Sequence, residues 1–84
     1  MTNEEYKKYK EEEKRLLSLV PEIDRTAAEF YLEKRYDYYF SIYSEEKLSF
    51  IESKSKANED LERIIRNEDW LNMYRFLMSR LITN

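Results

Sequence analysis

Residues 30–50 read FYLEKRYDYYFSIYSEEKLSF, and this stretch holds eight of the chain's twelve tyrosine and phenylalanine residues. At about 100° per residue, one face of a helix collects a set of apolar side chains: Ala28, Leu32, Tyr36, Tyr39, Tyr43 and Phe50. The segment YDYYFSIY also partly alternates as a strand would, and aromatic residues favour strands. A strand needs a turn and a second strand to pair with, however, and the sequence offers neither. We therefore predict a helix over residues 24–52.

The lack of glycine extends this prediction to the whole chain. Its 84 residues include no glycine and one proline. Tight hairpins usually need glycine or asparagine at positive φ, whereas helices need such residues only at their ends. A chain this short buries only about 60–65% of the surface that its unfolded form exposes, so its core is thin. We predict a single all-α domain over residues 1–84. It is a small three-helix bundle with helices at 3–20, 24–52 and 59–82, and a dimer is one way of completing its core.

Residues 3–20 form the first predicted helix. Its apolar residues share one helical face: Tyr6, Tyr9, Leu16, Leu17 and Val20. The charged residues between them place acids and bases three and four positions apart, which is typical of a solvated face. Pro21 ends the helix, because the residue before a proline disfavours the helical conformation. Asp24 then stands where a cap of the next helix is expected.

Residues 52–60, ESKSKANED, separate the second and third predicted helices. They contain a single apolar residue, Ala57, so we predict a turn here, with Asn58 capping the third helix. The alternative is one long helix through this region, because five residues are spaced by sevens: Tyr36, Tyr43, Phe50, Ala57 and Ile64. The third helix carries another capping signal near Asn67, which predicts a break or bend there.

The residue inventory excludes most catalytic sites. The chain has no histidine and no cysteine, which removes imidazole bases, thiol nucleophiles and ordinary zinc sites. Without glycine it also lacks a phosphate-binding loop. The carboxylate pairs Glu29/Glu33 and Glu59/Glu62 lie on helix faces outside any apolar pocket pattern, and we interpret them as solvated. We expect a protein that is not an enzyme and that uses no cofactor or metal.

The balance of charge and hydropathy restricts the partners. Fifteen basic and eighteen acidic residues give a net charge of −3, with both signs mixed throughout the chain. Nucleic-acid binding needs a basic face, so a nucleic-acid partner is not expected. No apolar run approaches the about 20 residues that cross a bilayer, and the polar N-terminus does not resemble a signal peptide. We expect a cytoplasmic protein without a membrane partner.

A second stripe on the middle helix, which begins at Ala27, is the candidate partner surface. Tyrosine and arginine often dominate interface energetics, since they combine large contact area with a polar group. The candidate residues of this stripe and its flank are Tyr31, Lys34, Arg35, Tyr38 and Ile42. The alternative is that the stripe seats the N-terminal helix within the bundle. Met73 and Phe76, which point away from the apolar arc of the last helix, form a second candidate contact edge.

These observations predict a protein–protein interaction module, with a protein partner of unknown identity. The small size, acidic charge and tyrosine-rich helices suggest a phage or mobile-element accessory protein that binds and inhibits or redirects a host protein. Two other functions stay open. One is a self-assembling structural or scaffold protein, such as a homodimer. The other is a small nucleic-acid-associated regulator that uses the cations of the first helix: Lys7, Lys8, Lys10, Lys14 and Arg15.

Overall fold

The computed structural model describes residues 3–43 and 50–82. Within these residues the chain forms four α-helices and one 3₁₀ turn, and no strand: α1 (Asn3–Leu19), η1 (Glu22–Asp24), α2 (Arg25–Tyr43), α3 (Phe50–Asn67) and α4 (Trp70–Ile82). The all-α prediction is confirmed, with four helices in place of three.

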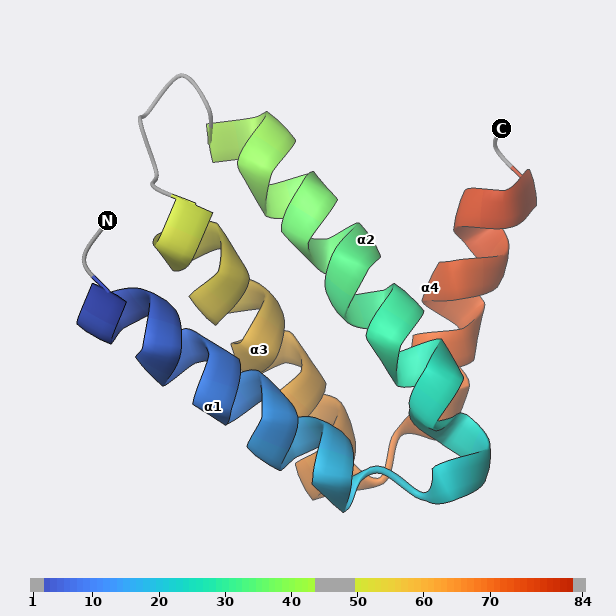
Figure 1. Cartoon of the computed structure of the whole chain (residues 1–84). Coiled ribbons are helices and arrows are strands. Elements are labelled where there is room, and N and C mark those ends of the chain that lie inside the picture. The colour runs from blue at the N-terminus through green and yellow to red at the C-terminus, as the bar shows by residue number, and fades with distance from the viewer. Residues whose placement is uncertain (1–2, 44–49, 83–84) are drawn as a thin grey trace.

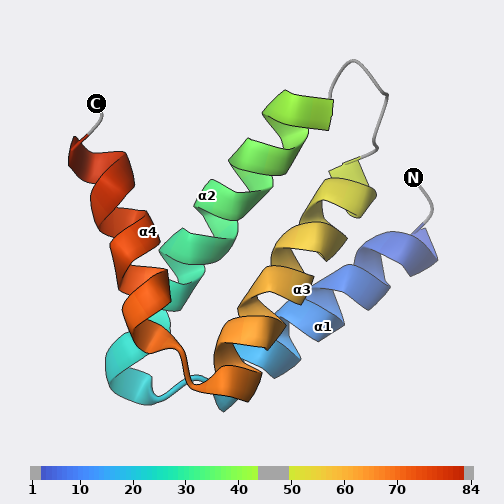
Figure 2. The same cartoon turned by 180° about the vertical axis from the view of Figure 1, so that it is seen from behind.

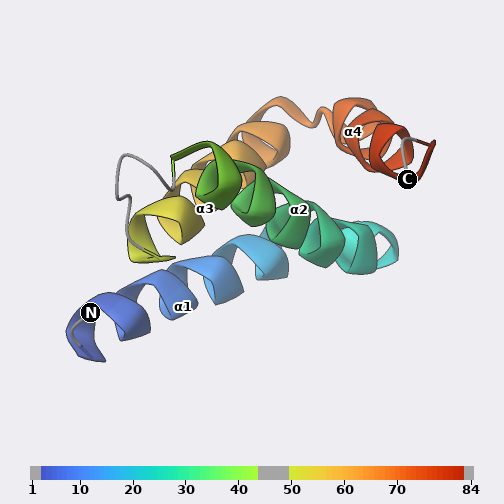
Figure 3. The same cartoon turned by 90° about the horizontal axis from the view of Figure 1, so that it is seen from above.

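Helix α3 packs against both α1 and α2, and α4 packs mainly against α2. Figures 1 and 2 show α2 and α4 starting close together and diverging toward their C-terminal ends. Seen from above in Figure 3, α4 lies at the opposite side of the molecule from α1. The radius of gyration is 13.0 Å, compared with about 12 Å expected for a closely packed domain of this length. The molecule is therefore slightly less compact than a closely packed domain of the same length.

Helix α1 forms as the sequence predicts, with Tyr9 and Leu16 of its apolar face buried, and Val20, just after the helix, is buried too. Pro21 follows the helix, and Asp24, the predicted cap of the next helix, is the last residue of the 3₁₀ turn that leads into α2. Leu16 and Val20 join Ala28 and Leu32 of α2 and Leu61 of α3 in one buried cluster. The core thus lies where α1, α2 and α3 meet.

The predicted continuous helix over residues 24–52 is wrong. Helix α2 and helix α3 are separate elements that run antiparallel, side by side (Figures 1 and 2). Residues 44–49 lie outside the described residues. The same arrangement excludes one long helix from α2 into α3. Folding back is favoured because it brings apolar residues of both helices into one core, which a straight helix would leave in water.

The turn predicted for residues 52–60 is also wrong, since these residues are the interior of α3. Ser53 and Ala57 are 0% and 1% exposed, and they continue into the buried Leu61 and Ile64 at helical spacing. Small side chains at these positions let α3 approach its neighbours closely, so a polar sequence is compatible with a buried face. Asn58 is not a cap: it is buried, and its Nδ2 donates a hydrogen bond to the Tyr9 carbonyl at 3.5 Å.

The break predicted near Asn67 is confirmed. Helix α3 ends at Asn67, and Glu68 adopts a left-handed conformation with φ of 51°. The Glu68 amide donates to the Ile65 carbonyl at 3.2 Å, and the Asp69 amide donates to the Ile64 carbonyl at 3.0 Å. This pair of hydrogen bonds is the Schellman pattern that ends many helices. It redirects the chain so that α4 starts beside α2 instead of continuing α3.

Candidate functional site

The candidate stripe of α2 faces α4, and not the N-terminal helix as the alternative interpretation proposed. Tyr31 is only 6% exposed, and its ring meets that of Phe76 edge-on at 5.3 Å between centroids. Ala27 is half-buried against the same core. Farther along α2, Tyr38 and Ile42 are 36% and 48% exposed, because α4 diverges from α2 in this direction. The stripe is therefore covered at its N-terminal end and open at its C-terminal end.

Arg35 already has partners inside the chain. Its Nε donates to Oδ2 of the buried Asp60 at 2.8 Å, and a terminal nitrogen donates to the Tyr39 hydroxyl at 3.1 Å. That hydroxyl donates in turn to Asp60 at 2.7 Å. Burial lowers the pKa of the Arg35 guanidinium, but the hydrogen bonds to Tyr39 and Asp60 outweigh it and raise the pKa. Arg35 thus ties α2 to α3, which sequence spacing alone did not indicate.

The two candidate residues of α4 belong to the core or its edge. Met73 is 0% exposed, so the prediction that it forms an exposed edge is wrong. The reason is the turn at Glu68, which rotates α4 and directs Met73 inward. Phe76 is half-buried and is contacted by three side chains: Tyr31, Arg35 at 5.1 Å and Arg80 at 4.9 Å. Sequence periodicity could not fix this rotation because it depends on the preceding turn.

An apolar hollow lies between α2 and α4. It has a volume of about 560 Å³ and is lined from both helices by Thr26, Ala27, Phe30, Lys34, Tyr74, Leu77, Met78 and Arg80. Phe30 on one helix is 54% exposed, and Met78 on the other is 59% exposed. The Tyr74 hydroxyl donates to Asp24 at 2.5 Å, which connects α4 to η1. Tyr74, Leu77 and Met78 belong to the apolar arc of α4, and α2 leaves part of this arc exposed.

The hollow continues toward the C-terminal ends of both helices. A second depression of about 290 Å³ is lined by Lys34, Asp37, Tyr38, Ser41 and Arg80, so it shares Lys34 and Arg80 with the first. Arg80 also lies over the Tyr38 ring, at 6.0 Å from its centroid. The two depressions together are called the α2–α4 groove below. The groove is apolar at one end and polar at the other, and it includes the predicted residues Lys34 and Tyr38.

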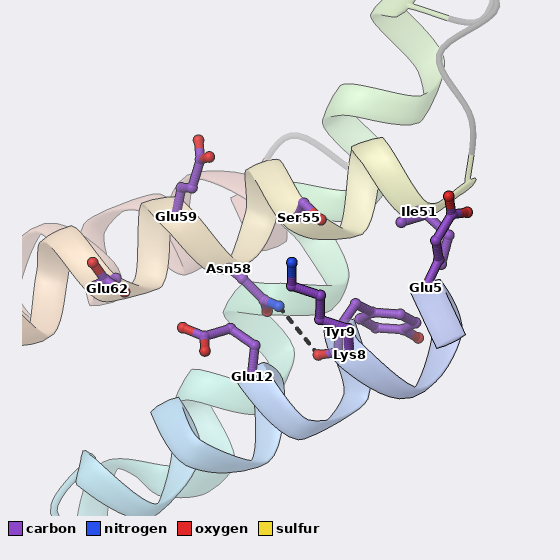
Figure 4. Close-up of a pocket in the computed structure, with 9 residues that line it drawn as sticks. All are labelled: Glu5, Lys8, Tyr9, Glu12, Ile51, Ser55, Asn58, Glu59 and Glu62. Carbon is purple, nitrogen blue, oxygen red and sulfur yellow. Dashed lines mark hydrogen bonds between the residues drawn. The ribbon is translucent and has the colours of Figure 1, made fainter. Parts of the chain in front are cut away.

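A different hollow, between α1 and α3, is lined by four glutamates. Figure 4 shows Glu5, Glu12, Glu59 and Glu62 around it, together with Lys8. Arg15 forms ion pairs with Glu12 at 2.6 Å and with Glu62 at 3.2 Å. The hydrogen bond from Arg15 lowers the pKa of Glu12, so this carboxylate stays ionised near neutral pH and is unsuited to donate a proton. Within the described residues, no group of three or more acidic side chains is placed to hold a metal ion.

Two of the cations of α1 are already paired with carboxylates. Lys10 pairs with Glu13 at 3.7 Å, and Arg15 is held by two carboxylates. A phosphate backbone is bound by cations that can exchange their counterions for it, and neighbouring carboxylates oppose this. The geometry therefore adds no support for nucleic-acid binding through α1.

Comparison with known proteins identifies no relative: no family model, curated protein or solved structure matches the chain. Among residues 3–43 and 50–82, none of the helices has the length and apolar character needed to cross a bilayer. Within the described residues, the α2–α4 groove is the candidate binding site.

Proposed function

We propose that the chain is a non-catalytic protein-interaction module and that the α2–α4 groove is its docking surface. The observation that carries this proposal is the exposure of Phe30 and Met78, which line the same hollow from two different helices. Burying an exposed Phe or Met side chain completely stabilises a complex by about 1.5–3 kcal/mol, so half-exposed side chains contribute about 1 kcal/mol each. A concave apolar surface with a few polar groups at its edge is typical of a binding site.

The amino-acid composition of the chain supports a binding role over a catalytic one. It has no histidine, cysteine or glycine, so the common nucleophiles, bases and phosphate loops are missing from the sequence itself. We further propose that the partner is a host protein that this chain inhibits or redirects, as an accessory protein of a phage or mobile element. That part of the proposal is supported by size and composition alone.

Affinity capture with matched variants tests the docking surface. A tagged chain carrying Phe30→Glu and Met78→Glu should lose the proteins that the unaltered chain captures from lysate of the source cell. Phe40→Glu is the matched control, because Phe40 lies on the same helix, is 46% exposed and lines neither depression of the groove. Circular dichroism of each variant checks that helicity is unchanged. Capture that is equally strong with the double variant would refute the proposal.

Self-assembly is the second candidate function. It is favoured by Ile23 and Leu71, which are 90% and 61% exposed and lie outside the lining of the groove. Exposed apolar side chains of this size promote association when they gather on one face. Sedimentation velocity over a dilution series tests this function, and Leu71→Ser should shift any dimer toward monomer. A chain that is monomeric at every concentration excludes it.

A further inference from the structure

The α2–α4 groove has features that specify the chemistry of its occupant. We infer that the groove binds an amphipathic α-helix of the partner protein, with apolar residues at one end and acidic residues about one turn farther along. This inference rests on the proposed function, since it concerns the same docking surface. Three properties of the groove lead to it: the nature of its walls, its length, and the order of apolar and charged residues along it.

The walls of the groove favour a helix over an extended segment. Both walls are α-helices, α2 and α4, and the backbone amides and carbonyls in the interior of a helix are already used within it. An extended peptide gains main-chain hydrogen bonds at the edge of a sheet, and the groove offers no such edge. A helical segment satisfies its own backbone and needs only side-chain contacts from its receptor. The occupant that these walls suit is therefore a helix.

The length of the groove matches a short helix. It runs along α2 from Thr26 to Ser41, which at 1.5 Å per residue is about 22 Å, or four turns. The walls lie closest at their N-terminal ends and diverge beyond them, as Figures 1 and 2 show. A third helix laid between them would contact both walls and fill the two depressions.

The charged residues of the groove select acidic side chains. Lys34 and Arg80 are the charged residues that line the apolar depression, although the chain as a whole has a net charge of −3. Among the described residues, Lys34 is not in any ion pair. The Asp24 carboxylate accepts a hydrogen bond from Tyr74, which lines the apolar depression, and Asp37 lines only the polar end. Charge complementarity therefore favours an acidic partner.

On each wall, an apolar residue is followed by a cationic residue about one helical turn later. On α2, Phe30 precedes Lys34 by four residues, and on α4, Leu77 precedes Arg80 by three. Residues three and four apart lie on one face of a helix, so each wall presents its apolar group and then its cation in the same direction. An occupant in register with both walls needs its apolar side chains and its carboxylates separated by about one turn.

Fluorescence polarisation with two model peptides tests this inference. Both are labelled helices of about four turns with the same leucine face, and their polar positions carry glutamate in one and lysine in the other. The unaltered chain should bind the glutamate peptide about tenfold more tightly than the lysine peptide at low salt, with the difference shrinking as salt is added. Lys34→Glu should remove most of this preference, and Lys34→Glu with Arg80→Glu should reverse it.

Two controls separate the groove from general charge effects. Lys7→Glu with Lys8→Glu changes the net charge as much as the groove pair, on exposed positions of α1, and should leave the preference intact. Lys34→Glu alone keeps the test valid even if the loss of Arg80, which lies over Phe76 and Tyr38, weakens the fold.

The possible failures are distinguishable. If the two peptides bind equally, or if neither binds, the inferred partner chemistry is wrong. The docking surface is still supported in that case if the double variant Phe30→Glu with Met78→Glu abolishes capture. If the unaltered chain self-associates and this same double variant is monomeric, the occupant is a second copy of the chain and the inference is overturned. If capture survives in that variant, the proposed function itself fails.

Discussion

Removal of the Asp60 carboxylate should be among the most damaging single changes to the contact between α2 and α3. The Asp60 side chain is 6% exposed and accepts hydrogen bonds from Arg35 and Tyr39, both on α2. Asp60→Ala leaves the guanidinium and the phenol without this acceptor. Breaking a fully buried ion pair costs about 3–5 kcal/mol, and since the Arg35 side chain is 20% exposed, water relieves part of this. We expect the free energy of unfolding to fall by about 2–3 kcal/mol.

Urea unfolding, followed by far-UV circular dichroism near neutral pH, measures this change. A domain of this length is stable by about 4–12 kcal/mol, so the loss is readily detected. Arg35→Met is the matched variant, because Asp60 then keeps Tyr39 and Arg63, the latter at 3.7 Å. In the Arg35→Met background, Asp60→Ala should cost less than about 1 kcal/mol. The reasoning is refuted if the effects of the two single variants simply add, or if Asp60→Ala changes stability by less than about 0.5 kcal/mol.

Two further predictions concern packing and pH. Ala57→Leu should destabilise the chain by about 1–3 kcal/mol in urea unfolding, because Ala57 is 1% exposed inside α3. Glu59→Leu, at an exposed position of the same helix, is its control, and a neutral Ala57→Leu would contradict the packing of α3. Burial raises the pKa of Tyr9 and Tyr31 above the ordinary value of 10.0, and burial together with the hydrogen bond to Asp60 raises that of Tyr39. Above pH 10 the unfolded chain therefore loses phenol protons that the folded chain keeps. The free energy of unfolding should then fall as the pH rises, by up to about 1.4 kcal/mol per pH unit for each phenol. Tyr39→Phe should make this decrease less steep, and a free energy of unfolding that stays constant above pH 10 would contradict the raised pKa values.

The candidate site was only partly predictable. Tyr31, Lys34 and Tyr38 were identified from one stripe of α2, and two of them line the groove that the structure shows. The opposite wall was not identified, because helical periodicity says which residues share a face and not which neighbour covers that face. Met78 and Met73 illustrate this: both are apolar residues of α4, yet one is 59% exposed and the other is 0% exposed.

Three features could be predicted from the sequence by itself: the all-α class, the first helix with its end at Pro21, and the break after Asn67. The lack of glycine, the geometry of proline and the capping residues act within a few positions of the chain, so they can be read without a fold. Only the tertiary structure shows that residues 52–60 belong to a helix with a buried face. Ser53 and Ala57 are buried because their small side chains allow close packing, which a search for hydrophobic residues does not detect. The tertiary structure also decided the divergence of α4 from α2. That divergence depends on the turn at Glu68 and on the core around Met73, and it creates the groove to which we assign the function.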